Sequence, residues 1–97
     1  MVLIADSGST KCDWQVYDTT GSMMFQKRTI GINPIIHSDG DICSVLQELK
    51  NDMPNEISQI EFYCAGGKNA ESKQRLLQIF GQFFKQIYIF SILNPIS

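Results

Sequence analysis

The residues with the clearest chemical potential lie close together near the start of the chain. A carboxylate, Asp6, precedes the run Ser7–Lys11, in which Gly8 is surrounded by hydrogen-bond donors. Successive backbone N–H groups from Gly8 to Lys11 can form a concave anion site, and Gly8 can take a positive φ without strain. A phosphate group could approach closely there. The Ser9 and Thr10 hydroxyls and the Lys11 charge would add to its binding.

Asp6 is also a candidate metal ligand. Mg²⁺ prefers one or two carboxylates together with phosphate oxygens and water, so Asp6 is predicted to hold Mg²⁺ through water beside the phosphate. The same residue types are common in turns, and a hairpin can contain them without binding anything. The chain contains no G-x-x-x-x-G-K-[ST] phosphate loop.

The elements that must position this segment begin with a hairpin. Two apolar runs, Val2–Ala5 and Trp14–Asp18, predict its strands, and Met23–Thr29 predicts a third strand after a turn at Gly21. A helix is then expected after Ser38, which with Asp41 resembles a capping box. Pro54 should end this helix. Its predicted apolar stripe consists of Ile42, Val45, Leu46, Leu49 and Met53.

A second strand–helix–strand unit follows. Ile57–Cys64 reads as a strand, Asn69 or Ser72 as the cap of a helix, and Gln86–Phe90 as a fifth strand. The buried face of this helix is predicted to contain Leu76, Leu77, Phe80, Phe83 and Phe84. The order is βββαβαβ, which predicts an α/β fold with a mixed five-stranded sheet of ribonuclease H-like layout. The two helices should cover either opposite faces or neighbouring strips of the sheet.

Three further positions are candidates for binding or catalysis. Gly66 and Gly67 follow a predicted strand, where α/β sheets place ligand crevices, although tight turning explains them equally well. Asn33 precedes Pro34 in an exposed loop, and turn formation alone accounts for such an asparagine. His37, the single histidine, is expected to be a solvated loop residue rather than a general base.

Composition excludes several classes of protein. With 97 residues, 43% hydrophobic and 19% charged, the chain is expected to be one small globular domain. The net charge of −2 gives no basic surface for nucleic acid, and no apolar run reaches the ~20 residues of a membrane helix. Cys12, Cys43 and Cys64 show neither disulfide nor zinc spacing. A reducing cytoplasm is the expected location.

The pattern D-S-G-S-T-K-x-D-W resembles the phosphate-1 motif of the actin/hexokinase/Hsp70 superfamily. It is most similar to the BadF/BadG/BcrA/BcrD-type ATPases, which include N-acetylglucosamine kinases. The resemblance runs from Val2 to about Tyr88 and includes Gly31–Pro34 and Tyr63–Gly67. It implies an ATP-dependent kinase or ATPase with Mg²⁺, a small amino sugar as acceptor, and a contact from Asn33 to that sugar. Phosphate contacts are implied for Asp6, Gly8, Ser9, Thr10, Lys11, Gly66 and Gly67.

The chain departs from this family at its end. In relatives the strand after the second helix ends in a Ser-Asp pair whose Asp is the general base, whereas Ile92 stands there in this sequence. The expectation is therefore one N-terminal actin-like ATPase lobe over 1–97, truncated before the catalytic Asp and the second domain. A non-catalytic domain that acts by association, with an exposed apolar face and a homodimer, is the alternative. An ATPase that serves a dehydratase would need an iron–sulfur cluster, which the scattered cysteines do not support.

Overall fold

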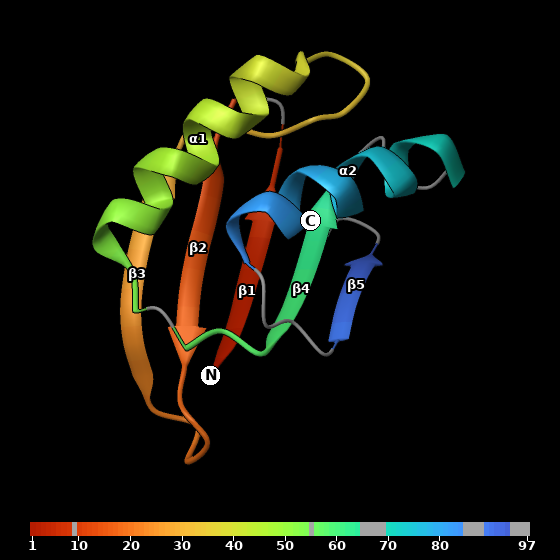
Figure 1. Ribbon diagram of the computed structural model, residues 1–97. Helices are drawn as coiled ribbons and strands as arrows, with labels where there is room; N and C mark the ends of the chain where they lie inside the picture. Colours follow the sequence, from red (N-terminus) through yellow and green to blue (C-terminus); the bar gives the residue numbers. More distant parts are fainter. Residues whose placement is uncertain (9, 55, 65–69, 85–88, 94–97) are drawn as a thin grey trace.

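The computed structural model describes residues 1–97 except 9, 55, 65–69, 85–88 and 94–97 (Figure 1). It contains one sheet of strand order β3-β2-β1-β4-β5 and two helices. The elements in chain order are β1 (Val2–Ser7), β2 (Cys12–Tyr17), β3 (Met23–Thr29), α1 (Asp39–Asp52), β4 (Gln59–Cys64), α2 (Ala70–Phe83) and β5 (Ile89–Leu93). The prediction of an α/β fold with a mixed sheet and two helices is confirmed.

The central strand β1 has a different kind of neighbour on each side. It pairs antiparallel with β2, where Asp6 lies opposite Asp13, and parallel with β4, where Ser7 lies opposite Cys64. β3 continues the antiparallel side after a turn in which Gly21 has a φ of +87°. β5 continues the parallel side. The ends of β1 and β4 therefore meet at one edge of the sheet, beside the turn between β1 and β2.

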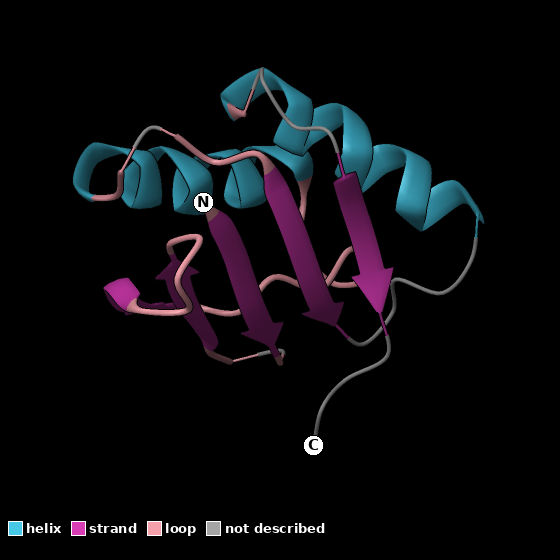
Figure 2. Cartoon of the chain, turned by 90° about the horizontal axis from the view of Figure 1, so that it is seen from below, coloured by secondary structure: helices cyan, strands magenta, loops and turns pink. Residues whose placement is uncertain are grey.

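Both helices cover the same face of the sheet (Figure 2). Along β1 the side chains alternate between fully buried positions, such as Leu3 and Ala5, and half-exposed ones, such as Ile4 and Asp6. β4 shows the same alternation. Of the two arrangements expected from the sequence, the one with neighbouring strips on one face is the one observed.

The core between the helices and the sheet is aromatic at its centre. The ring of Phe62 lies 6.0 Å from that of Trp14 and 5.1 Å from that of Phe80, measured between centroids. The Trp14 indole N–H donates a hydrogen bond of 2.8 Å to the Thr29 hydroxyl, so the one polar atom of this ring is satisfied. These contacts join β2, β4, α2 and the end of β3.

Helix α1 agrees with its predicted cap and stripe. The Ser38 side chain accepts a hydrogen bond from the Asp41 N–H, and Leu46 is fully buried. Helix α2 differs in two details. Leu77 is 42% exposed, while Ile79 is buried in its place. Ser72 lies inside the helix instead of capping it, and Asn69 is outside the described residues. Within the described part of the chain, neither helix is long and apolar enough to cross a membrane.

Candidate functional site

The turn between β1 and β2 is closed by a backbone hydrogen bond. The Gly8 N–H donates to the Lys11 carbonyl oxygen at 2.8 Å, so this N–H is used within the turn. It is therefore not free to bind an anion, whereas the sequence had suggested that it would form part of a concave anion site. Gly8 does not have a positive φ either. A Cβ added there would meet only the Lys11 carbonyl, at an ordinary 3.8 Å. The turn itself therefore does not require glycine at this position.

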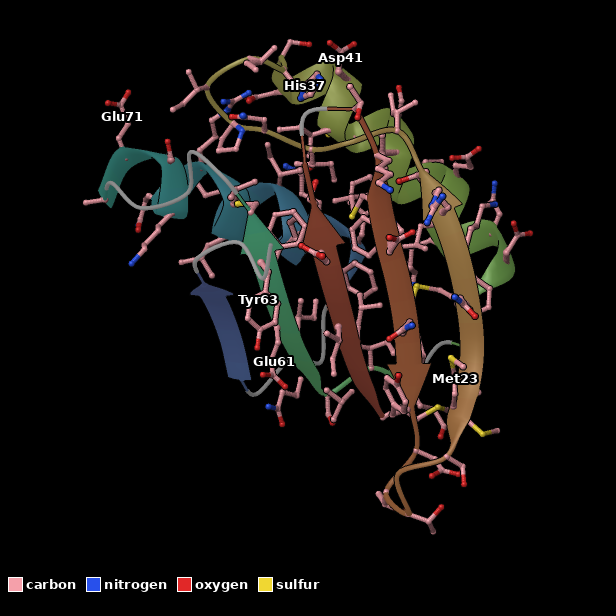
Figure 3. The ribbon with its side chains drawn as sticks, turned by 180° about the vertical axis from the view of Figure 1, so that it is seen from behind. Met23, His37, Asp41, Glu61, Tyr63 and Glu71 are labelled. Carbon is pink, nitrogen blue, oxygen red and sulfur yellow. The ribbon has the colours of Figure 1, made fainter. Side chains whose placement is uncertain are left out.

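Beside this turn, a row of polar side chains crosses the open face of the sheet. Asp6 lies opposite Tyr63 on one side and Asp13 on the other. Arg28 follows on β3 and donates through Nε to Asp13 Oδ1 at 2.6 Å. Figure 3 shows Tyr63 on this face, turned away from the helices. The row places two carboxylates on adjacent strands, where opposed Cβ atoms lie about 4.5–5.5 Å apart.

Arg28 controls the charge of one of these carboxylates. Its hydrogen bond to Asp13, together with its positive charge, holds the pKa of that carboxyl below the ordinary aspartate value. Lys11 lowers the pKa further through its charge. Arg28 lies on an edge strand and its side chain is 63% exposed, and the register across β2 and β3 is what gives it a partner. Asp13 is thereby kept ionised beside Asp6.

The residues at this end of the hairpin suit Mg²⁺ better than a metal ion whose ligands all come from protein side chains. No group of three or more His, Cys, Asp or Glu side chains comes together among the described residues. Two adjacent carboxylates, Asp6 and Asp13, are the number that Mg²⁺ takes from a protein when phosphate oxygens and water complete its coordination. Thr10 and Lys11 are exposed next to them. Ser9 lies outside the described residues.

Ser7 connects the hairpin to the loop that follows β3. Its buried hydroxyl accepts a hydrogen bond of 2.7 Å from the Ile32 N–H and donates one of 2.9 Å to the Ile32 carbonyl. This reciprocal pair joins residues that are 25 positions apart. Sequence reasoning did not assign Ser7 a role, because nothing local indicates which backbone group it meets. The contact fixes residues 30–33 beside the hairpin turn (Figure 1).

Asn33 forms the corner of this loop and is 8% exposed. Its Oδ1 accepts from the Ile35 N–H at 2.9 Å, and its carbonyl accepts from the N–H groups of Ile36 and His37. The turn-forming role considered for Asn33 is therefore present in the structure. The side-chain Nδ2 has no hydrogen-bond partner within the described residues, so one amide donor remains for a ligand.

Arg75 on α2 holds the same loop from the other side. Its Nη2 donates to the His37 carbonyl at 2.6 Å, and further hydrogen bonds reach the Pro34 carbonyl and the Asp39 carboxylate. These partners lie 36 to 41 residues away, so no sequence pattern could have indicated Arg75. Residues 30–38, which we call the Asn33 loop, are thus tied to β1 by Ser7 and to α2 by Arg75.

The remaining predicted site residues are not brought to this place by the described structure. Gly66 and Gly67 lie outside the described residues. Ile92, the residue at the expected position of a general base, lies in β5 opposite Phe62. A shallow hollow between the end of β3 and α1, lined by Ile30, Ser44, Val45 and Glu48, contains none of the predicted site residues.

Comparison with solved structures found a close similarity in fold. The chain superposes on the crystal structure of a Porphyromonas gingivalis protein, provisionally described as an N-acetylglucosamine kinase, with a TM-score of 0.82 and 26% sequence identity. The match covers 97% of this chain and 34% of that one. No protein-family model and no curated protein matches the sequence. The resemblance to N-acetylglucosamine kinase-like proteins is confirmed, over about a third of the length of such a protein.

Proposed function

We propose that this chain is the N-terminal, phosphate-binding lobe of an ATP-dependent sugar kinase with a ribonuclease H-like fold. The observation that carries the proposal is the joining of two sites by Ser7. The carboxylate-bearing hairpin and the Asn33 loop come from separate parts of the sequence, and one buried hydroxyl holds them side by side. The similarity in fold to a protein described as an N-acetylglucosamine kinase supports an amino sugar as the acceptor.

In this proposal the hairpin binds the phosphates of ATP. Phosphoryl transfer depends on positioning and on neutralising the negative charge of the transferred group. Thr10 and Lys11 are exposed at the turn and supply a hydroxyl donor and a positive charge. Asp6 and Asp13 would hold Mg²⁺, whose chemistry when bound is to neutralise and orient the phosphate oxygens. Because Gly8 has no Cβ, the phosphates can come close to the turn.

The Asn33 loop is proposed to bind the sugar. The Asn33 Nδ2 donor can pair with a hydroxyl or carbonyl oxygen, and both groups occur on an N-acetylated amino sugar. Asn33 is 8% exposed, and no buried side-chain N or O atom among the described residues lacks a partner, so this unpaired donor lies at the surface, where a ligand can reach it. Gly66 and Gly67 are retained in the proposal as contacts to the nucleotide, on the grounds of their place after β4.

The 97 residues are proposed to bind these ligands without transferring the phosphoryl group. Ile92 cannot accept the proton of a sugar hydroxyl, and general-base catalysis typically contributes about 10²–10⁴ in rate. Incubation with Mg-ATP and N-acetylglucosamine should therefore give no sugar phosphate above background. Sustained turnover that is lost in Asp6→Ala would place the base elsewhere, with Asp13 the first residue to test.

Two further features belong to the same proposal. None of the three cysteines forms a disulfide within the described residues, and burial raises the pKa of the Cys12 thiol to about 12, so this thiol acts as a small core residue. Cysteines without disulfides suit the cytoplasm.

Homodimer formation stays a prediction. The open sheet face is mostly polar, and the large exposed apolar side chains lie on the edge strand β3, in the Asn33 loop and on α2, at Met23, Met24, Ile30, Ile35, Ile36 and Leu77.

Binding of Mg-ATP, measured by titration calorimetry with and without Mg²⁺, tests the proposal. Asp6→Asn should weaken Mg²⁺-dependent binding by at least about tenfold. Glu61→Gln is the matched control, because Glu61 is a carboxylate on the same face, opposite Ile4 and farther from the turn (Figure 3). It should leave the affinity unchanged. Equal affinity of Asp6→Asn and the parent protein would contradict the assignment of the hairpin.

A further inference from the structure

The Asn33 loop contains a hydrogen bond that depends on the protonation of a histidine. The Asn33 backbone N–H donates to His37 Nδ1 at 2.9 Å, and the His37 N–H donates back to the Asn33 carbonyl at 2.8 Å. A backbone N–H can only donate, so Nδ1 must act as the acceptor and carries no proton in this arrangement. The ring is therefore neutral, with its proton on Nε2.

Among the described residues, the hydrogen bond to His37 Nδ1 is the one that satisfies the Asn33 N–H. The residue is almost fully buried, and an N–H that loses its acceptor in such a place carries an unfavourable desolvation cost. A proton on Nδ1 would also bring two donors face to face. Relieving both requires the His37 ring and the Asn33 N–H to separate, which removes one of the hydrogen bonds that fix Asn33, the other at this residue being the one from the Ile35 N–H to Oδ1.

Charged groups of both signs surround His37. From α2, the Arg75 guanidinium donates to the His37 carbonyl and disfavours a second positive charge nearby. From the start of α1, Asp39 and Asp41 favour that charge, although Asp39 is already paired with Arg75. Asp41 and Glu71 are exposed, and neither carboxylate forms a hydrogen bond or ion pair with His37 among the described residues.

We infer that His37 is a positioning residue for the Asn33 loop: its unprotonated ring holds Asn33 in place, and protonation of Nδ1 releases it. Histidine is the side chain whose protonation most often acts as a pH switch in proteins, so acid is the signal that would bring about this release. The consequence for sugar binding, a weaker affinity in acid, rests on the function proposed above. The movement of the loop does not depend on that function.

The test follows the Asn33 amide by NMR in the free protein from pH 8 to pH 5. In the parent protein the Asn33 amide shift should follow the same titration curve as the His37 ring protons. Its hydrogen exchange, corrected for the intrinsic effect of pH, should become roughly two- to twelvefold faster in acid, which corresponds to the net contribution of one hydrogen bond. The amide of Leu46 in α1 is the internal reference and should not change.

Two variants separate positioning from simple packing. In His37→Asn the shorter side chain can place an amide oxygen near the position of Nδ1, so the loop should stay closed and the Asn33 amide should be independent of pH. In His37→Ala the amide should show fast exchange at every pH. The inference is overturned if the His37 ring titrates in the parent protein while the Asn33 amide does not respond, or if His37→Asn shows the same pH dependence as the parent.

Discussion

The two faces of the sheet are built for different purposes. On the face under the helices, Leu3, Trp14 and Phe62 are fully buried and make apolar contacts. On the open face of the same strands, Asp6, Asp13 and other polar side chains remain partly exposed. Because successive residues of a strand point to opposite faces, both surfaces are encoded in one alternating sequence. The covered face stabilises the fold, while the open face and the turns at its edge carry the groups that can bind a ligand.

This division limits where substitutions should have each kind of effect. A change on the covered face should alter the free energy of unfolding before it alters binding. A change in the row of Asp6, Asp13 and Arg28 should alter binding or pH dependence with little effect on stability in neutral solution. Ser7 and Thr29 are buried polar residues of the covered face that bond to the loop after β3, so changes there should show intermediate behaviour.

The largest effect is expected from truncating the core at Leu46. Leu46→Ala should lower the free energy of unfolding by about 2–5 kcal/mol, because a fully buried side chain leaves a cavity. Leu77→Ala is the matched control, since that leucine is 42% exposed and its loss should cost within about 0.5 kcal/mol. Urea denaturation followed by circular dichroism measures both. Equal losses would contradict the division of the helices into a buried face that contains Leu46 and an exposed face that contains Leu77.

A smaller effect is expected from Thr29→Val, which keeps the shape of the side chain. The Thr29 hydroxyl accepts from the Trp14 indole and donates to the Ile30 carbonyl at 2.8 Å. Its removal leaves the buried indole N–H without a partner, which typically costs about 1–3 kcal/mol. Thr29→Ser retains the hydroxyl and should recover most of the loss in the same denaturation experiment. If valine proved as stable as threonine, the hydrogen bond would have no part in holding β3 to the core.

The smallest effect should come from Arg28→Gln, and it should depend on pH. Arg28 lowers the pKa of Asp13 in the folded state, so this pair contributes stability above the unfolded pKa of aspartate and loses it as the pH falls through the lower folded value. The urea denaturation midpoints of the parent protein and of Arg28→Gln should therefore differ at pH 7 and become equal in strong acid. A difference that grows on acidification would have the wrong sign for this pair.

The sequence predicted the parts of the structure that follow from local rules. Alternation predicted the hairpin, the Ser38 cap predicted the start of α1, and the stripe through Leu46 predicted its buried face. The same helical reasoning placed Leu77 inside and missed Ile79. The observed stripe runs through Leu76, Ile79 and Phe80 at i, i+3 and i+4, and Leu77 lies one position off it. The described part of β5 spans Ile89–Leu93, and the predicted start at Gln86 lies outside the described residues.

The candidate site was predictable only in part, for a different reason. Asp6 and Asn33 could be selected from residue type and from the resemblance to a known family. Ser7 and Arg75 join segments that are 25 to 41 residues apart, and their partners are backbone carbonyls and amides, which every residue has. Nothing in a one-dimensional pattern distinguishes such a contact. The pairing of Asp13 with Arg28 likewise required the register between β2 and β3.

The central claim is that the hairpin turn and the Asn33 loop form one ligand-binding edge. The most direct test is to map amide shifts of the 97-residue chain on adding Mg-ATP and, separately, N-acetylglucosamine. Mg-ATP should give saturable shifts from Asp6 to Asp13, and the sugar should give them around Asn33, with the Met23–Met24 end of the sheet unchanged. Saturable shifts centred on Met23 and Met24, or none at either proposed site, would contradict the account.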